Sequence, residues 1–307
     1  MSVRHEPVLL DEVLGYLGGG PGLYLDATLG DAGHAEALLE REPSARLFGA
    51  DRDREALARS RERLARFGGR VNFAHATFRE LPDAHRALGG EPLAGALFDL
   101  GMSSPQIDDA TRGFSFAKDG PLDLRMDPSR GEPASARLAR IEPEALAEVL
   151  RVHGDVPAAS RLARAIVTDA ARGALLTTRA LTAVVDRALG GRPHPRRYAQ
   201  VFQALRIWVN GEAEDLEAAL NWLPDAVRPG GVVVTLAYHS GEDRRIKQSL
   251  RGAPERVSRR LPSIEPRLPE SPWQILTRKV VTPTHDEQKR NPRARSARLR
   301  AFRRKSA

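Results

Sequence analysis

The sequence predicts an α/β protein whose parallel, doubly wound sheet is interrupted by a helical insertion. Three observations lead to this fold class. Short apolar segments alternate with amphipathic helical segments over residues 23–100, helical segments follow one another over residues 143–189, and apolar strand patterns return from residue 231. Strands that alternate with helices of this length form parallel sheets with right-handed crossovers.

The first third of the chain contains four expected strands joined by helices. Strands are predicted over residues 23–29, 46–50, 71–76 and 93–100, and helices over residues 34–41, 54–67 and 78–88. The loop Gly30–Gly33 connects the first strand to the first helix, and Gly68 and Gly69 end the second helix.

The remaining residues divide into an insertion, a second part of the sheet domain and a tail. Helices are predicted over residues 143–150, 158–171, 178–189 and 199–227, a strand over 231–239, and late antiparallel strands within 273–282. The predicted parts are residues 1–105 and 199–288 for the sheet domain, 106–198 for the all-helical insertion, and 289–307 for a basic tail.

The positive charge of the chain is concentrated in that tail. The whole chain has 48 Lys and Arg residues against 40 Asp and Glu, a net charge of +8. Nine of the basic residues lie between Lys289 and Lys305, so residues 1–288 carry 39 minus 40, or −1. Such a tail is typical of a protein that binds a polyanion. A solvated terminus in an arginine-rich protein is the alternative.

Composition excludes several other classes of protein. The absence of cysteine excludes disulfides, zinc fingers and thiol catalysis, and fits a reducing cytoplasm. No run approaches the roughly 18 apolar residues of a membrane span, and the charged N-terminal segment does not resemble a signal peptide. The eight histidines include no pair at metal-ligand spacing, so we expect no metal.

The first loop and the second strand suggest a nucleoside site. Asp51 closes the second strand 18 residues after Gly33, an interval at which an acid can bind ribose hydroxyls. The loop lacks the three glycines that seat a pyrophosphate, so S-adenosyl-L-methionine fits better than a dinucleotide. A dinucleotide enzyme and an incidental turn remain as alternatives.

The end of the fourth strand suggests methyl transfer to an amine. Asp99 is followed by Ser103, Ser104 and Pro105 at the carboxyl edge of the sheet, where doubly wound folds bind ligands. The lone pair of an exocyclic base amine is delocalised into the ring, so groups that accept its hydrogens are needed while it attacks the methyl group. A plain Ser-Pro turn is the alternative.

These segments, together with others, resemble one known family. The ribosomal RNA small subunit methyltransferase H family of bacteria shares with this sequence eight blocks in order: HEPVLL (5–10), DATLG (26–30) with GH (33–34), FDLG (98–101) with SSPQ (103–106), RGFSF (112–116), PLDLRMD (121–127), FQALRI (202–207), HS (239–240) with EDR (242–244), and NPRARS (291–296).

The resemblance implies a class I, Rossmann-like, S-adenosylmethionine-dependent methyltransferase core with an inserted all-helical domain. It implies methylation of the N4 of one cytidine in the decoding centre of 16S rRNA, with the small ribosomal subunit or a late assembly particle as partner. Matching positions assign cofactor contacts to Ala32, Gly33, His34, Asp51, Phe78, Asp99 and Gln106. Two departures from the family pattern are Ala32, which replaces a usual glycine, and Tyr238 with Gly241, which replace Phe and Leu. The first matters little if the backbone of Ala32 is ordinary.

Catalysis is assigned to Ser103, Ser104 and Pro105. Substrate contacts are expected at Asp123, Arg125, Arg206, His239, Arg293 and Arg295. For several of these a structural role is an equal alternative: an Asp123–Arg125 ion pair, a buried network around Arg206, or a helix cap at His239. The small share of aromatic residues argues against a surface that stacks many bases, and leaves Phe114, Phe116 or Trp208 as partners for one flipped base.

Two other classes of function remain open at this point. One is a methyltransferase of the same chemistry that acts on DNA or protein. The other is a ribosome-assembly factor that retains the fold without catalysis, although the retained Gly33, Asp51, Asp99 and Ser103–Gln106 argue against it.

Overall fold

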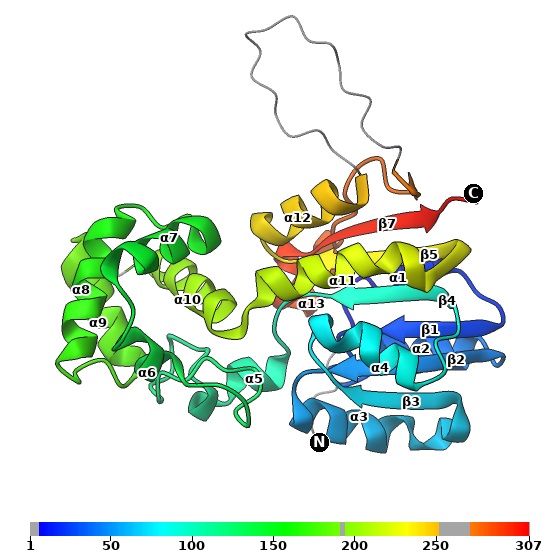
Figure 1. Cartoon of the computed structure of the whole chain (residues 1–307), viewed down its shortest axis with the longest axis horizontal. Coiled ribbons are helices and arrows are strands. Elements are labelled where there is room, and N and C mark those ends of the chain that lie inside the picture. The colour runs from blue at the N-terminus through cyan, green and yellow to red at the C-terminus, as the bar shows by residue number, and fades with distance from the viewer. Residues whose placement is uncertain (1–5, 191–193, 252–270, 307) are drawn as a thin grey trace, which may run out of the picture. The chain divides into compact units, whose positions relative to one another are not determined.

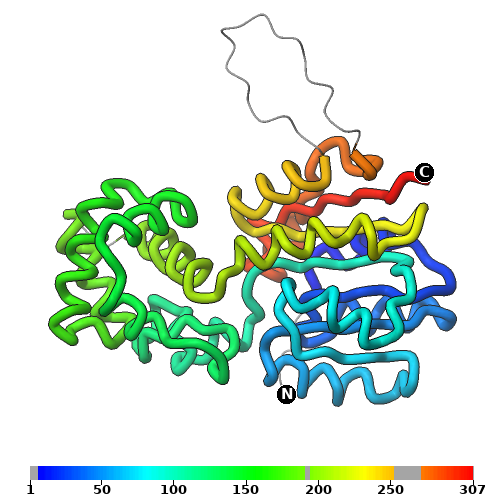
Figure 2. The backbone as a smooth tube through the Cα atoms, in the orientation of Figure 1, coloured from blue at the N-terminus to red at the C-terminus, as the bar shows by residue number. Residues whose placement is uncertain are grey.

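The computed structural model describes residues 6–190, 194–251 and 271–306. The chain forms two compact units. The sheet unit comprises Met1–Gly101 and Asp215–Ala307, and the helical unit comprises Met102–Glu214. The chain leaves the sheet unit after β4 and returns to it in α11 (Figure 2).

The sheet unit is built on seven strands in the order β3-β2-β1-β4-β5-β7-β6 (Figure 1). Their bounds are β1 (Gly22–Asp26), β2 (Ala45–Asp51), β3 (Val71–His75), β4 (Leu93–Asp99), β5 (Val227–Ala237), β6 (Trp273–Ile275) and β7 (Arg298–Arg304). The first five strands in the order pair in parallel, and β7 is antiparallel to both β5 and β6. This topology confirms the predicted Rossmann-like α/β core.

Helices cover both faces of the sheet because the buried strands are apolar on both sides. On one face α4 (Leu81–Ala87), α11 (Glu212–Ala226) and α12 (Ser240–Arg251) share a core cluster with the strands. On the other face lie α1 (Leu10–Leu17), α2 (Gly33–Arg41) and α3 (Arg54–Leu64). Val233 of β5 packs on the first face, and its neighbours Val232 and Val234 pack on the second.

Short helices complete the sheet unit. They are η1 (Ala65–Arg70), η2 (Phe78–Glu80), α13 (His285–Arg290) and η4 (Pro292–Ser296). The segment 78–88, predicted as one helix, therefore begins with the 3₁₀ turn η2 before α4. Of the predicted strands within 273–282, β6 forms over Trp273–Ile275, and Val281 makes an isolated antiparallel bridge to Leu299.

The helical unit has a core of its own. Its elements are α5 (Ser104–Asp108), η3 (Ala110–Arg112), α6 (Ala134–Leu138), α7 (Pro143–Gly154), α8 (Ala159–Ala171), α9 (Thr178–Leu189) and α10 (Pro195–Asn210). Leucines from α7, α8, α9 and α10, such as Leu150, Leu162, Leu181 and Leu205, are fully buried together in one cluster. The predicted all-helical insertion is thus present as a compact body.

Its boundaries differ from those predicted. The helix expected over 199–227 is two helices, because Gly211 ends α10 in the left-handed conformation with φ 61°. Left-handed backbone at this position ends a helix, and glycine adopts it without a steric cost. Helix α10 packs Val201 and Phe202 into the helical core. The helical unit therefore ends at Glu214 and not at residue 198.

The basic tail is also different from the expectation. Residues 298–304 form β7, which lies between β5 and β6, and Leu299, Ala301 and Phe302 are fully buried. Arginine side chains at the ends of this strand remain exposed while its middle is part of the core. Residues 289–306 are therefore not an appended arm, and removing them would remove an internal strand of the sheet.

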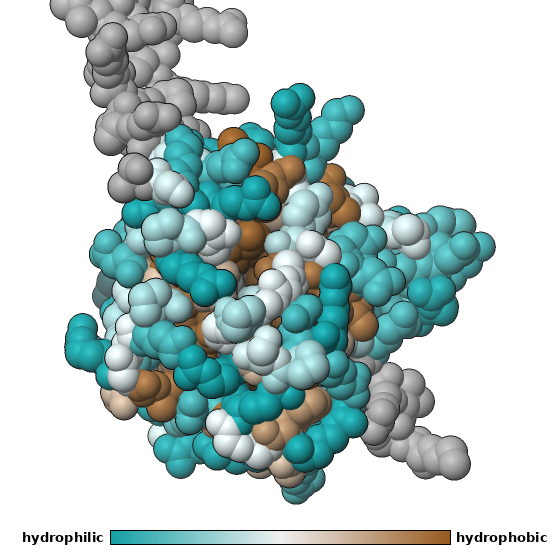
Figure 3. Space-filling model, turned by 90° about the vertical axis from the view of Figure 1, so that its right-hand side faces the viewer, coloured by the Kyte–Doolittle hydropathy of each residue, from teal (hydrophilic) through white to brown (hydrophobic). Residues whose placement is uncertain are grey.

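The surface of the sheet unit is mainly hydrophilic on the side at which β7 ends, with apolar residues scattered among polar ones (Figure 3). In the part of the chain that the structure describes, no helix is both long enough and apolar enough to span a membrane.

Replacing Phe302 by Ala tests whether the tail is part of the core. Because Phe302 is fully buried between β5 and β6, we expect Phe302→Ala to lower the free energy of unfolding by about 3–5 kcal/mol. Urea denaturation followed by circular dichroism measures this. The neighbouring exposed Arg303, changed to Ala, should alter stability by less than about 0.5 kcal/mol. Equal stability of the two variants would contradict the assignment.

Candidate active site

Three carboxylates meet at one edge of the sheet unit. Asp26, Asp51 and Asp99 are the last residues of β1, β2 and β4. These strands are adjacent and parallel, with β1 in the middle, so their carboxyl ends lie side by side. Asp51 and Asp99 are predicted cofactor residues, whereas Asp26 is known from the sequence only as the first residue of the DATLG motif.

Asp51 connects the end of β2 to the loop after β1. The backbone N–H of Gly30 donates to Asp51 Oδ2 at 2.8 Å, and the N–H of Asp53 donates to Oδ1 at 2.8 Å. Burial raises the pKa of Asp51 to about 6, although both of these hydrogen bonds act in the opposite direction. Each carboxylate oxygen can accept more than one hydrogen bond, so Asp51 is able to accept from ribose hydroxyls as well.

Asp26 is the most deeply placed of the three acids. Its side chain is 4% exposed and accepts a hydrogen bond from the N–H of Thr28 at 3.1 Å. Burial, together with the nearby charges of Asp99 and Asp51, raises the pKa of Asp26 to about 7, although the hydrogen bond from Thr28 acts in the opposite direction. Two neighbouring negative charges disfavour the ionised form of a carboxyl group.

Asp99 is oriented by contacts from three other segments. The hydroxyl of Tyr238 donates to Asp99 Oδ1 at 2.8 Å, and the N–H of Asp99 donates to Thr28 Oγ1 at 2.7 Å. His34 Nδ1 lies 3.8 Å from Asp99 Oδ2. Burial, followed by the charge of Asp99, raises the pKa of Tyr238 well above its usual value, so the hydroxyl keeps its proton. Tyr238, one of the two departures from the family pattern, is thus a partner of Asp99.

The start of α2 is shaped by packing. Ala32 is the N-cap residue with φ 58° and ψ 30°, so its backbone is left-handed. The replacement of the usual glycine by Ala32 was expected to matter little only with an ordinary backbone, and the backbone is not ordinary. A non-glycine residue in this conformation is strained by about 1 kcal/mol. Gly33 faces Pro7, whose Cγ would lie 2.5 Å from an added Cβ. His34 is buried and its Nε2 lies 2.9 Å from the carbonyl oxygen of Val8.

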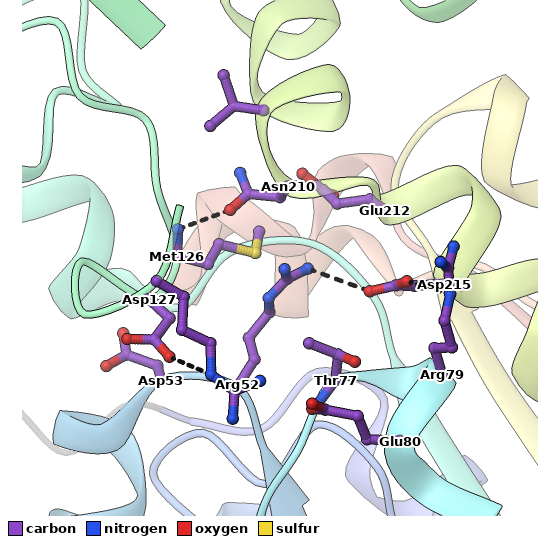
Figure 4. Close-up of polar contacts among 12 residues, drawn as sticks. Arg52, Asp53, Thr77, Arg79, Glu80, Met126, Asp127, Asn210, Glu212 and Asp215 are labelled. Carbon is purple, nitrogen blue, oxygen red and sulfur yellow. Dashed lines mark hydrogen bonds and ion pairs between the residues drawn. The ribbon is translucent and has the colours of Figure 1, made fainter. Parts of the chain in front are cut away.

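Phe78 lies at the start of η2, where it packs edge-on against Phe98 with ring centroids 5.4 Å apart. Its neighbour Arg79 contacts Asp215, with Nε and Oδ1 3.3 Å apart. The same carboxylate lies 4.0 Å from Nη1 of Arg52, as Figure 4 shows. Asp215 belongs to α11 and is 7% exposed. Through its contacts with Arg52, which follows β2, and Arg79, which follows β3, it connects the ends of these two strands to α11 within the sheet unit.

The segment expected to carry catalysis begins the helical unit. Ser103 is the N-cap residue of α5, and Ser104 and Pro105 form its first turn. Gln106 closes a capping box, since its Oε1 accepts from the N–H of Ser103 at 3.0 Å. Gln106 is thus a local structural partner of Ser103, and its assignment to the cofactor stays a prediction.

Asp123 and Arg125 form the ion pair that was the alternative to a substrate contact. Arg125 Nε and Nη2 donate to the two carboxylate oxygens of Asp123 at 2.7 and 2.8 Å. The remaining nitrogen, Nη1, donates to the carbonyl oxygens of Pro128 and Gly131 at 2.8 and 3.1 Å. The pair therefore organises the loop over residues 123–131.

Arg206 and Asn210 belong to a buried network. Arg206 makes a two-pronged ion pair with Glu212, with distances of 2.9 and 2.8 Å. Asn210 accepts from the N–H of Met126 at 2.8 Å (Figure 4), and it donates to the carbonyl of Leu124 at 2.7 Å. Arg206 is 7% exposed, so its predicted contact with the substrate would have to compete with the ion pair to Glu212.

His239 lies at the start of α12. Its Nδ1 accepts from the N–H of Glu242 at 3.4 Å, and its Nε2 lies 3.0 Å from Glu242 Oε1. These contacts correspond to the helix-capping alternative. Arg293 and Arg295 are exposed on η4. No cluster of three or more metal-ligating side chains occurs among the described residues.

The predicted site residues therefore fall into two groups. Ala32, Gly33, His34, Asp51, Phe78 and Asp99 share the sheet unit, whereas Gln106 and the three predicted catalytic residues belong to the helical unit. Two supporting residues of the sheet unit, Asp26 and Asp215, were not among the predicted site residues, and Tyr238 was noted only as a departure from the family pattern. An acid inside the otherwise apolar segment 23–29 was the signal that could have identified Asp26.

Comparison with known proteins identifies the family. The profile of the MraW methylase family matches residues 2–305. The chain belongs to the MraW methylase family. It is therefore a methyltransferase, and S-adenosyl-L-methionine is its methyl donor.

Similar proteins cover almost the whole chain. Ribosomal RNA small subunit methyltransferase H of Sorangium cellulosum is 45% identical over 308 residues, which cover 98% of this chain and 91% of that protein. The protein of the same name from Thermomicrobium roseum is 42% identical over 316 residues, covering 98% and 94%. A putative methyltransferase from Streptococcus mutans solved in complex with SAH aligns over 96% of this chain and 94% of that one, with a TM-score of 0.40 and 11% identity. The assignment to the family rests on the profile and on the similar sequences, and not on this distant structural similarity.

The residues present fit this donor. Its ribose hydroxyls and amino groups need acceptors, and its sulfonium is positively charged. The carboxylates of Asp26, Asp51 and Asp99 at one sheet edge supply both acceptors and negative charge, and the ring of Phe78 offers an apolar surface.

The buried carboxyl of Asp26 should make the stability of the protein depend on pH. Its pKa of about 7 in the folded state exceeds the value of about 3.9 in an unfolded chain, so the folded state binds the proton more tightly. The free energy of unfolding should therefore fall as pH rises from about 4 to about 7. In the natural protein this contribution to the free energy of unfolding should fall by about 2–3 kcal/mol between pH 5 and pH 8. Asp26→Asn removes the titrating group, so the free energy of unfolding of the variant should decrease by that much less over the same range.

Urea denaturation of both proteins at the two pH values measures that difference. Asp11→Asn, which changes an exposed acid on α1, is the matched control and should leave the pH dependence unaltered. If Asp26→Asn behaves like this control, Asp26 is not the titrating group.

The hydroxyl of Tyr238 should contribute to cofactor affinity through Asp99. Tyr238→Phe keeps the ring and removes the hydrogen bond that orients the carboxylate. We expect the Kd for S-adenosyl-L-methionine to rise about 5-fold, equivalent to about 1 kcal/mol. Isothermal titration calorimetry measures it, and Asp51→Ala should cause a larger loss.

Tyr24→Phe is the control for this experiment. The Tyr24 hydroxyl donates to the carbonyl of Gly20 at 3.4 Å, away from the three acids. Its removal should leave the Kd unchanged. Equal affinities of Tyr238→Phe and the natural protein would mean that Asp99 does not need this partner.

Proposed function

We propose that this protein methylates the exocyclic N4 of one cytidine in the decoding centre of 16S rRNA, near the P site. The observation that carries the proposal is similarity over nearly the whole chain to proteins named ribosomal RNA small subunit methyltransferase H. The small ribosomal subunit, or a late particle in its assembly, is the proposed substrate, and the cytoplasm is the proposed place of action.

S-adenosyl-L-methionine supplies an electrophilic methyl group at this site. Asp51 accepts hydrogen bonds from ribose hydroxyls, and Phe78 packs beside the base of the cofactor. Asp99 provides negative charge near the sulfonium, and its orientation is set by Tyr238. The proposed contacts are completed by Ala32, Gly33, His34 and Gln106.

Ser103, Ser104 and Pro105 form the proposed acceptor edge for the cytosine amine. The Ser hydroxyls and the carbonyl groups beside Pro105 accept from N4–H and so orient the nitrogen toward the methyl group. Positive charge develops on N4 as the new bond forms. Acceptors at this position therefore stabilise the transition state more than the bound base.

The target base has one suitable aromatic partner among the three considered. Phe114 is 5% exposed and belongs to the helical core, and the ring of Trp208 is covered by the guanidinium of Arg137 at 4.0 Å. Phe116 is 37% exposed, and its ring packs against the rings of Tyr198 and Phe202, with centroids 5.7 and 5.9 Å away. We therefore assign Phe116 as the surface on which the flipped base stacks.

Other predicted substrate residues divide by their contacts. Exposed Arg293 and Arg295 are proposed to meet RNA phosphates, and the loop held by Asp123 and Arg125 is proposed to approach the substrate. Arg206 and His239 already have intramolecular partners, so we assign them a supporting role.

Removing both serine hydroxyls should slow the chemical step. We expect Ser103→Ala with Ser104→Ala to lower kcat by about 10²-fold, equivalent to roughly 2.7 kcal/mol, without changing the affinity for S-adenosyl-L-methionine. Transfer of tritiated methyl groups to small ribosomal subunits from a strain that lacks the enzyme measures kcat. Normal turnover by the double variant would place the acceptors elsewhere, with Asp123 and His239 as the next residues to test.

Two further variants separate chemistry from binding and folding. Because Ser103 also caps α5, Ser104→Ala alone should slow turnover while preserving the cap. Phe116→Ala should instead raise the KM for RNA, since it removes a stacking partner and no acceptor.

Mapping the methylated nucleotide tests the proposed function as a whole. The expected product is a single N4-methylcytidine in the decoding centre of 16S rRNA. When DNA or ribosomal proteins are offered in place of RNA, we expect no transfer of tritiated methyl groups to them. Incorporation into either polymer, or no transfer to any of the three, would overturn the proposal.

A further inference from the structure

Two segments that the sequence analysis singled out meet in the sheet unit, although the proposed function leaves their contact unused. One is the start of α12, which contains Asp243. The other is the basic segment that forms β7. Arg300 Nε lies 2.6 Å from Asp243 Oδ1, and Nη2 lies 3.3 Å from Oδ2. Both side chains are buried, with exposed fractions of 9% and 6% for Arg300 and Asp243.

Two more cations surround the same carboxylate. Lys247 Nζ lies 3.4 Å from Asp243 Oδ2, and Arg298 Nη1 lies 3.8 Å from it. Burial by itself would raise the pKa of Asp243, but the hydrogen bonds and charge of Arg300, with the charge of Lys247, hold the pKa below its usual value. Asp243 is therefore ionised, and one negative charge stands against three positive charges.

The excess positive charge faces the solvent. Lys247 is 37% exposed and Arg298 is 46% exposed. Arg300, by contrast, is buried and donates hydrogen bonds to both carboxylate oxygens of Asp243. Lys247 and Arg298 are therefore able to contact an external anion as well as Asp243. The buried Asp243–Arg300 pair fixes the two segments that carry them, so less conformational entropy is lost when they bind. We call Lys247 and Arg298 the site-edge cations.

The register of β7 places these cations relative to the three acids. Arg298 pairs with Ala237 near the carboxyl end of β5, and Asp99 pairs with Leu236 of the same strand. Because β1, β4 and β5 are parallel, this is the edge at which Asp26 and Asp99 lie. Arg303 pairs with Val232, five residues away and roughly 17 Å along the strand. Arg303 and Lys305 therefore lie toward the opposite edge, and we call them the far-edge cations.

We propose that the site-edge cations form a binding surface for RNA backbone phosphates beside the edge at which methyl transfer takes place, and that the far-edge cations take no part. Arginine presents a planar fork to phosphate oxygens, and lysine presents a mobile point charge. Phosphate contacts fix the position of a nucleic acid without reading its sequence. The inference rests on the proposed RNA substrate.

The test compares two double charge reversals of equal size on the full-length protein. Lys247→Glu with Arg298→Glu changes the site-edge cations, and Arg303→Glu with Lys305→Glu changes the far-edge cations. Small ribosomal subunits and a 16S rRNA transcript are the probes. The KM for subunits, the Kd for the transcript at several salt concentrations, the Kd for S-adenosyl-L-methionine and the thermal unfolding midpoint are measured for each variant.

We expect the site-edge reversal to raise the KM for subunits and the Kd for the transcript by about 10-fold or more. The salt dependence, as the slope of log K against log salt concentration, should become shallower by about 2. The far-edge reversal should change either constant by less than about 2-fold. Cofactor affinity should stay unchanged in both. Since glutamate at position 247 adds a negative charge near Asp243, the neutral pair Lys247→Ala with Arg298→Ala provides a second measurement if the reversal unfolds the protein.

Equal effects of the two reversals, or no effect of the site-edge reversal and its neutral counterpart, would overturn the proposal. It would also be overturned if binding of subunits falls while binding of the naked transcript does not, because the surface would then contact a ribosomal protein. If the natural protein methylates no RNA but the two reversals still differ in transcript binding, the proposed function fails and the phosphate surface stands.

Discussion

The placement of three carboxylates, one of them buried, at the ends of adjacent parallel strands is the constraint on which the rest of the structure depends. The order β2-β1-β4 brings Asp51, Asp26 and Asp99 to one edge. Like charges that are removed from water repel one another strongly unless hydrogen-bond donors surround them. The loops after the strands supply those donors through the N–H groups of Gly30 and Thr28.

This constraint gives the loops a function before any cofactor binds. The turn after β1 uses Thr28 twice, once as a donor to Asp26 and once as an acceptor from Asp99. The left-handed Ala32 and the contact of Gly33 with Pro7 then set the start of α2. A site that is negatively charged and already hydrogen-bonded suits a cationic methyl donor, since the donor finds its acceptors oriented in advance.

Strand β7 combines two requirements in seven residues. Its middle must be apolar because both faces of the sheet are covered by helices, and Phe302 and Leu299 are fully buried there. Its two ends carry arginines that leave the core. Asp243 neutralises Arg300 at the point where a cation would otherwise be buried alone. A segment that reads as a uniform basic tail is therefore divided by the sheet into two separate groups of charge.

The sequence by itself determined the fold class, the order of the elements and the family, because these depend on local periodicity and on motifs that are contiguous in the chain. It also placed Asp51 and Asp99 at strand ends. Tertiary structure alone decided which polar groups meet, since Tyr238 and Asp99 are 139 residues apart and Asp243 and Arg300 are 57 apart. It likewise decided that α10 belongs to the helical unit and that the tail is an internal strand. Helix packing and strand pairing depend on surfaces from distant segments, and no local pattern within a single segment records its partner.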